Sequence, residues 1–167
     1  MKVYKLHPNV EVPTYGTSSA ACFDLKAFFE NTTHLMAYAE VEGITQKFKL
    51  IVSDESVIIE PGMRVIVPTG MIFDIPEGYS IRIHPRSGLS LKSGITLSNS
   101  EGVIDSDYRE ETGILLYNSS NADFVLKQGM RVAQGELVKD SRVNFEEIFE
   151  MPKRVGNRIG GMGSTGV

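Results

Sequence analysis

The segment 99–111, NSEGVIDSDYREE, holds five acidic residues and one basic residue. Asp105 follows an apolar pair, so we expect it at the end of a buried strand. If the strand continues, side-chain alternation puts Asp105 and Asp107 on one face and Tyr108 on the other. A carboxylate in that position, close to an anion-binding segment, could act as the general base that activates a water molecule. A charge run is usually only a solvated face, so that alternative stays open.

A second segment, PRSGLSLKSGI at 85–95, has residue types that suit an anion. We expect Pro85 to end a strand, and Ser87 and Gly88 to open a single helical turn whose free N–H groups point outward. Arg86 and Ser87 would then face an anion. The same residues could equally form a capped connector between two elements.

The C-terminal segment 151–167, MPKRVGNRIGGMGSTGV, contains five glycines, three cations and no acid, and so carries +3 in a chain whose net charge is −4. Residues 158–166 combine backbone N–H groups, two hydroxyls and a guanidinium, which together could wrap a polyphosphate. The Lys-Ser/Thr pair of a Walker loop is absent, which excludes an ordinary P-loop NTPase at this site. A Gly-rich terminus can also be simply flexible.

Two further polar side chains are predicted inside apolar strands. Asp24 lies in the run Ala-Cys-Phe-Asp-Leu, and Gln134 lies in a strand that begins at Arg131. A buried acid or amide must find polar partners, so both residues are more informative than surface ones would be.

The elements that must position these residues are mostly short strands. Val and Ile are frequent, turn residues recur every 8 to 12 positions, and no stretch keeps a helical apolar pattern over three turns. This sequence pattern predicts an all-β domain: a sandwich, a jelly roll or a small barrel. Turns are expected at 61–62, 68–70 and 76–78. The strands that we expect cover 3–6, 48–52, 79–83, 113–117, 124–126 and 131–138.

The chain of 167 residues is 41% hydrophobic, which suits one domain, predicted to cover 1–150 and to be followed by the arm 151–167. The stretch 31–56 has strand-like pieces but no recognisable chemistry, and its simplest interpretation is an added hairpin or loop on the surface. The negative net charge disfavours direct binding of nucleic acid. With no signal-like or membrane-length apolar run, we expect no membrane association and a cytoplasmic location.

The single cysteine, Cys22, cannot form an intrachain disulfide and is most simply a small core residue. The three histidines, His7, His34 and His84, are scattered along the chain. No Cys/His pair has the spacing of a zinc site, so the sequence predicts no structural metal.

Five segments occur together in one order: SSAACFDLKA (18–27), PRSGLSLKSGI (85–95), GVIDSDYRE (102–110), RVAQ (131–134) and RIGGMGSTG (158–166). With these segments the sequence resembles the trimeric dUTPase family, the deoxyuridine 5′-triphosphate nucleotidohydrolases. The resemblance implies a jelly-roll β-fold of the dUTPase type with a flexible Gly-rich arm. It also implies a homotrimer with three shared active sites, each closed by the C-terminal arm of a neighbouring subunit.

The resemblance further implies the reaction. Asp105 would deprotonate a water that attacks the α-phosphorus of dUTP in line, which gives dUMP and pyrophosphate. This reaction keeps uracil out of DNA and supplies dUMP for thymidylate synthesis. The implied cofactor is Mg²⁺, held mainly by the triphosphate, with Asp24 contributing through water. The implied phosphate-binding residues are Arg86, Ser87, Gly88, Gln134, Arg158, Gly163, Ser164 and Thr165. Those implied for uracil and deoxyribose are Asn99, Gly102, Val103, Ile104, Tyr108 and Met162.

Three features depart from the family pattern. Glu110 stands where the family usually has a small glycine, and Met162 stands where it usually has an aromatic that stacks on uracil. The thioether of Met162 can cover a base, although less rigidly. The stretch 31–56 is longer than the usual connection and is a candidate site for a protein partner.

Other functions fit parts of the sequence. The main alternative is a dUTP-binding regulatory protein that keeps the fold and acts through 31–56, and the intact Asp105 argues against it. A dCTP deaminase shares the implied fold but lacks this form of the third segment. A purely structural jelly roll would not need Asp105, Gln134 and Arg158 together.

Overall fold

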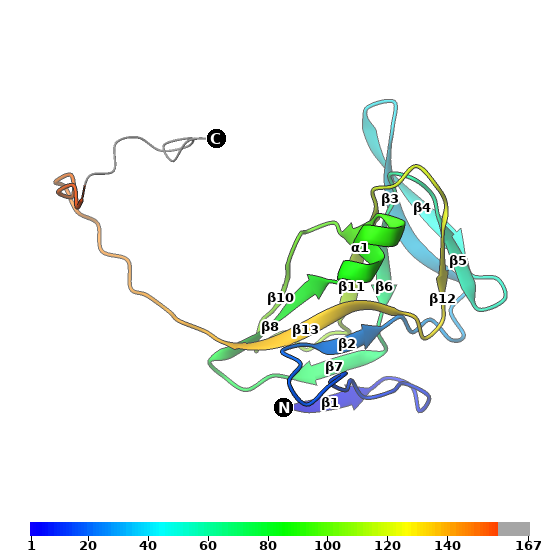
Figure 1. Ribbon diagram of the computed structural model, residues 1–167, viewed down its shortest axis with the longest axis horizontal. Coiled ribbons are helices and arrows are strands. Elements are labelled where there is room, and N and C mark those ends of the chain that lie inside the picture. The colour runs from blue at the N-terminus through cyan, green and yellow to red at the C-terminus, as the bar shows by residue number, and fades with distance from the viewer. Residues whose placement is uncertain (157–167) are drawn as a thin grey trace.

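The computed structural model describes residues 1–156, which form thirteen strands and one short helix (Figure 1). The elements in chain order are β1 (Lys2–Lys5), β2 (Phe23–Lys26), β3 (His34–Val41), β4 (Ile44–Ile51), β5 (Ser56–Ile59), β6 (Arg64–Pro68), β7 (Met71–Asp74), β8 (Tyr79–Pro85), α1 (Ser87–Ser93), β9 (Ile95–Leu97), β10 (Gly102–Ile104), β11 (Gly113–Asn118), β12 (Phe124–Lys127) and β13 (Arg131–Lys139). The predicted all-β fold is confirmed, and each predicted strand is present, although β4 begins earlier than expected.

The three predicted turns separate β5, β6, β7 and β8, and the last glycine of each turn has a φ between 69° and 80°. At Gly70 a Cβ atom would lie 2.4 Å from Cγ2 of Val10 and 2.9 Å from the ring of Phe28. Since both the dihedral angle and the close approach exclude a side chain, only glycine fits here.

Two larger sheets form the body. One has the strand order β10-β8-β13-β2 and the other has the order β4-β3-β6-β11-β9, while β1-β7 and β12-β5 form two-stranded ribbons. Strands far apart in the sequence are neighbours, such as β8 with β13 and β6 with β11. One apolar cluster joins the sheets, with Leu25 and Ile81 from the first and Ala37, Val65 and Ile114 from the second. This is a jelly-roll type of sandwich.

The stretch 31–56 contains the hairpin β3–β4, whose strands pair along their whole length. Glu42 and Gly43 at its turn both have positive φ, 52° and 78°, as a two-residue type I′ turn requires. The prediction of a purely surface element is wrong for the base of this hairpin. Leu35 and Ala37 are buried in the core, and β3 also pairs with β6. Only the distal part of the hairpin, near the turn at Glu42 and Gly43, is exposed on both strands.

Cys22 precedes β2 and is half-buried rather than part of the core, so its predicted core position is wrong. Along β2 the side chains of Phe23 and Leu25 are buried in the core. Alternation therefore places Cys22 and Asp24 on the opposite face of the sheet. Burial, and secondarily the nearby Glu136 carboxylate, raise the pKa of the Cys22 thiol.

After β13 the chain leaves the body on an extended path (Figure 1). Phe145 and Phe149 on this path are 95% and 90% exposed. The path begins before the arm predicted for 151–167, and the residues after 156 lie outside the described part of the chain. Within residues 1–156, no helix has the length and apolar character needed to cross a membrane.

Candidate active site

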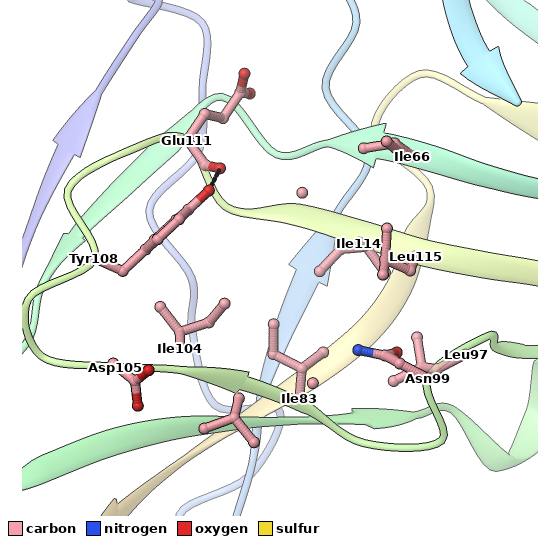
Figure 2. Close-up of a pocket in the computed structure, with 13 residues that line it drawn as sticks. Ile66, Ile83, Leu97, Asn99, Ile104, Asp105, Tyr108, Glu111, Ile114 and Leu115 are labelled. Carbon is pink, nitrogen blue, oxygen red and sulfur yellow. Dashed lines mark hydrogen bonds between the residues drawn. The ribbon is translucent and has the colours of Figure 1, made fainter.

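A cavity of about 350 Å³ lies between β10 and β11 (Figure 2). Its lining includes five of the residues predicted to contact uracil and deoxyribose, together with the predicted base: Asn99, Gly102, Val103, Ile104, Tyr108 and Asp105. The other walls are chiefly apolar: Ile66, Ile83, Leu97, Ile114 and Leu115. An apolar cavity with a few polar groups is the usual form of a small-molecule site.

The backbone around Asn99 enters the cavity because a tight turn precedes β10. The N–H of Glu101 donates to the carbonyl oxygen of Asn99 at 2.7 Å, and β10 then pairs with β8 so that Gly102 is opposite Ile83. A Cβ atom on Gly102 would lie 3.1 Å from Cβ of Ile83 and 3.6 Å from Nδ2 of Asn99. The missing side chain therefore lets the Gly102 backbone pack closely against Ile83, beside the Asn99 amide, which points into the cavity (Figure 2).

Asp105 does not continue the strand, so the predicted alternation of Asp105, Asp107 and Tyr108 is wrong. β10 ends at Ile104, and the N–H of Tyr108 donates to the carbonyl oxygen of Asp105 at 3.1 Å, which closes a turn. In a turn successive side chains do not alternate between two faces. Asp105 is exposed beside the cavity, and its carboxylate points away from the Tyr108 ring (Figure 2).

Tyr108 forms one side of the cavity and is held in place by Glu111. The hydroxyl of Tyr108 donates to the backbone carbonyl oxygen of Glu111 at 3.0 Å, and the Glu111 carboxylate accepts the N–H of Gly70 at 2.6 Å. The turn after β10 is thus tied to the turn between β6 and β7. Sequence reasoning treated Glu111 as part of a charge run, and no local signal distinguishes it. The neighbouring departure, Glu110, is exposed.

A second group of predicted residues gathers at the end of β8. Oδ1 of Asp24 lies 3.2 Å from Nε of Arg86, and Oδ2 of the same carboxylate lies 3.0 Å from Nη1 of Arg131. Arg86 also donates from Nη1 to the carbonyl oxygen of Arg131 at 3.0 Å. Two guanidinium groups around one carboxylate leave a local excess of positive charge, which suits an anion. Sequence reasoning missed Arg131, which is 107 positions from Asp24.

Gln134 belongs to the same group. It is opposite Asp24 on β2 and opposite His84 on β8, and its Nε2 donates to the carbonyl oxygen of Pro85 at 3.0 Å. Ser87 and Gly88 begin α1 and are both exposed. The predicted single helical turn is a seven-residue helix.

The two groups are not brought together within one chain. β10 runs antiparallel to β8, so that Ile104 is opposite Ile81 near the start of β8, whereas Arg86 follows the end of β8. Asp105 is therefore about six residues of strand from Arg86, which is roughly 20 Å at about 3.4 Å per residue. The remaining predicted site residues, Arg158, Met162, Gly163, Ser164 and Thr165, lie outside the described residues.

This combination, an all-β sandwich with a small-molecule cavity between β10 and β11 and a separate cationic group for an anion, is typical of a nucleotide-binding jelly-roll protein. A family model described as dUTPase matches residues 48–166. A deoxyuridine 5′-triphosphate nucleotidohydrolase of Rhizobium rhizogenes is 39% identical over 158 residues, which are 95% of this chain and 86% of that protein. The chain belongs to the dUTPase family, as the five segments predicted.

Solved structures agree with this assignment. The dUTPase of Streptococcus mutans matches with a TM-score of 0.60 and 27% identity, over 80% of this chain and 89% of that one. A variant dUTPase of phage phi11 of S. aureus, described with a structural Mg(II) ion, matches with a TM-score of 0.69 and 18% identity, over 91% of this chain and 98% of that one. These likenesses confirm the predicted jelly-roll fold of the dUTPase type.

Proposed function

We propose that this chain hydrolyses dUTP to dUMP and pyrophosphate. The observation that carries the proposal is the cavity that Asn99, the backbone of β10 and Tyr108 enclose, with Asp105 beside it. The family membership supports the same reaction, because its curated relatives are named deoxyuridine 5′-triphosphate nucleotidohydrolases.

Uracil selection follows from the polar groups of β10 and of the turn that precedes it. The uracil edge presents acceptor, donor and acceptor, so it pairs with a donor, an acceptor and a donor from the β10 backbone and the Asn99 amide. Cytosine reverses two of these positions and would leave buried groups unpaired, at a cost of about 1–3 kcal/mol for each group. Gly102 packs tightly against Ile83 in the cavity wall, and we propose that this wall leaves no room for the methyl group of thymine.

Tyr108 is proposed to lie against the deoxyribose. Because its hydroxyl is bound to the Glu111 carbonyl oxygen, the ring has a fixed position and cannot move aside for a 2′-hydroxyl. In this way the hydrogen bond between Tyr108 and Glu111 would let the site discriminate dUTP from UTP.

Asp105 is proposed as the general base. Its carboxylate takes a proton from a water molecule while the water oxygen forms a bond to the α-phosphorus. The bond from the α-phosphorus to the bridging oxygen breaks in line, and pyrophosphate leaves with the electron pair. An exposed carboxylate next to the nucleoside cavity is suitably placed for this step once a substrate covers it.

The triphosphate is proposed to lie on the second group of residues. Arg86, Ser87, Gly88 and Gln134 would contact its oxygens, and Arg131 adds a further cation. Asp24 holds both guanidinium groups in place. From the segment beyond the described residues, Arg158, Gly163, Ser164 and Thr165 would complete the phosphate contacts, and Met162 would cover the base.

Mg²⁺ fits this site as a partner of the substrate. A carboxylate offers about four acceptor positions, and the two arginines use two of those on Asp24, which leaves acceptors for metal-bound water. Asp24 would thus hold the ion through water, while the triphosphate supplies the direct ligands. When bound, the ion neutralises charge on the triphosphate oxygens.

The separation of about 20 Å between Asp105 and Arg86 supports a shared site, because one chain alone does not hold a nucleotide against both groups. We therefore propose a homotrimer in which one subunit provides the cavity and Asp105, a second provides Arg86 and Gln134, and the C-terminal arm of a subunit closes the site.

The test is product analysis with Mg²⁺ and, separately, dUTP, dCTP, dTTP and UTP. Conversion of dUTP alone to dUMP and pyrophosphate, abolished by Asp105→Asn, is the expected result. If dUTP is bound but stays intact, the proposal is wrong and the regulatory alternative takes its place.

The regulatory alternative is not favoured, since Leu35 and Ala37 at the base of the hairpin in 31–56 are buried in the core. A protein partner would have to contact its distal half, where Ile44 is 66% exposed.

A further inference from the structure

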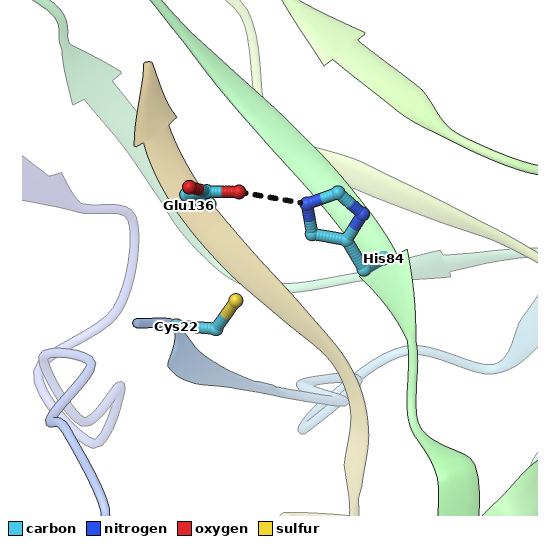
Figure 3. Close-up of side chains that lie close together, drawn as sticks. All are labelled: Cys22, His84 and Glu136. Carbon is cyan, nitrogen blue, oxygen red and sulfur yellow. Dashed lines mark hydrogen bonds and ion pairs between the residues drawn. The ribbon is translucent and has the colours of Figure 1, made fainter. Parts of the chain in front are cut away.

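One face of the sheet β10-β8-β13-β2 carries a cluster that the proposed reaction does not use (Figure 3). Gln134 on β13 is opposite both His84 on β8 and Asp24 on β2, and these side chains share a face. Two residues further along β13, Glu136 is on that face as well. The antiparallel register, continued past Phe23, puts Cys22 opposite Glu136. Three neighbouring strands thus bring a thiol, an imidazole and a carboxylate together.

The distances within this cluster suit one small ion. Sγ of Cys22, a ring nitrogen of His84 and a carboxylate oxygen of Glu136 all lie within 4.8 Å of one another, and Nε2 of His84 is 3.3 Å from Oε2 of Glu136. In a tetrahedral zinc site with bonds of about 2.0–2.3 Å, ligand atoms are about 3.3–3.8 Å apart. All three side chains are half-buried, so none of them is locked in the core.

The residues around the cluster are of the kind that orient metal ligands. Nδ1 of His84 is 3.7 Å from a Glu101 oxygen, so the Glu101 carboxylate can orient the imidazole while Nε2 faces Glu136. Arg82, which is opposite Glu136 in the strand register, forms its ion pair with Glu101 instead, at 3.6 Å. Within residues 1–156, Glu136 makes no ion pair other than the one with His84. Its carboxylate therefore faces the thiol and the imidazole without a fixed cation.

We propose that Cys22, His84 and Glu136 bind a divalent transition-metal ion of the zinc type, with water in the fourth position. The donor set decides the class of ion: thiolate and imidazole select zinc-like ions, whereas Mg²⁺ prefers oxygen ligands and an octahedral shell. The site is distinct from the Mg²⁺ of the proposed substrate complex and does not depend on dUTP hydrolysis. By joining β2, β8 and β13, the ion stabilises this sheet.

Cobalt titration of the untagged, metal-free full chain tests the proposal. Co²⁺ reports a bound thiolate by a charge-transfer band in the near ultraviolet, and Zn²⁺ then displaces it. We expect one ion per chain, no competition from millimolar Mg²⁺, and a fall in Co²⁺ affinity of at least about a hundredfold in Cys22→Ser, His84→Asn and Glu136→Gln. A missing charge-transfer band, or equal affinity in Cys22→Ser, would overturn the proposal.

The matched control is His7→Asn. His7 also lies beside a carboxylate, with Nδ1 3.8 Å from Oε2 of Glu30, but no cysteine completes that pair. Its Co²⁺ affinity should equal that of the unchanged chain. Equal losses in His7→Asn and His84→Asn would point to nonspecific binding by histidine and would contradict the assigned site.

A second measurement needs no substitution of the cysteine. Because Cys22 is the single thiol of the chain, alkylation by iodoacetamide reports how freely this thiolate reacts. Equimolar Zn²⁺ should slow alkylation at least about tenfold in the unchanged chain and in His7→Asn, but not in His84→Asn. Unchanged rates with Zn²⁺ would refute metal binding at Cys22, whatever the folding of the variants.

Discussion

Subunit complementation tests the shared site most sharply. Asp105→Asn removes the proposed base and Arg86→Ala removes a proposed phosphate contact, so each variant alone should be inactive. The structure puts these two positions at opposite ends of β8, about 20 Å apart. If a working site takes Asp105 from one subunit and Arg86 from another, a mixed oligomer contains some sites in which both groups are intact.

The expected recovery follows from random assembly. In a 1:1 mixture, half of the subunits offer an intact Asp105 and half offer an intact Arg86, so about one quarter of the sites have both. The two variants are unfolded together, refolded, and assayed for pyrophosphate release from dUTP. Mass spectrometry of differently tagged subunits confirms that mixed oligomers have formed.

A second mixture gives the control. The double variant Asp105→Asn/Arg86→Ala, mixed 1:1 with the unchanged chain, should retain about one quarter of the sites if they are shared and about one half if each chain holds its own. No recovery with the two single variants, together with one half retained in the control, would refute the shared site. A monomeric mass by light scattering would refute it as well.

Further predictions concern single contacts. Tyr108→Phe removes the hydrogen bond to Glu111, so the preference for dUTP over UTP in kcat/KM should fall by about fivefold, equivalent to ~1 kcal/mol. Gly102→Ala places a Cβ atom 3.1 Å from Ile83, and calorimetry in the inactive Asp105→Asn background should show dUTP affinity at least about tenfold weaker. Asp24→Asn frees both arginines, so kcat/KM for dUTP should fall by about tenfold, or roughly 1.4 kcal/mol. Chelation of Mg²⁺ should lower kcat/KM of the unchanged chain for dUTP by more than the tenfold expected for Asp24→Asn. An unchanged kcat/KM or dUTP affinity in any of these variants would contradict the role proposed for the contact that the variant removes.

The local features of this protein could be predicted from the sequence because their causes are local. Turns follow from the glycines at 62, 70 and 78, whose positive φ other residues adopt poorly. Strand bounds follow from alternation, as in β8, where Ile81 and Ile83 are buried and Arg82 is not. The five family segments identified the dUTPase family for the same reason, since each is a short run with its own chemistry.

Other features depended on contacts between distant residues. Strand alternation was expected to continue from Asp105 to Tyr108, but β10 ends at Ile104 and the Tyr108 N–H closes a turn there. Arg131 and Glu111 gained their roles only when folding brought them to Asp24 and to Gly70. Spacing along the chain carries no information about such pairs, because two strands can meet at any separation in sequence.

The sequence by itself determined the strand content, the turns, the family and the chemical types of the site residues. Only the tertiary structure decided which of those residues meet. Antiparallel pairing of β8 with β10 separates Asp105 from Arg86, and pairing of β13 with β2 and β8 joins Cys22 to His84 and Glu136. The physical reason is register: hydrogen bonds between strands fix which side chains are neighbours, and that choice is made by the whole sandwich rather than by any one segment.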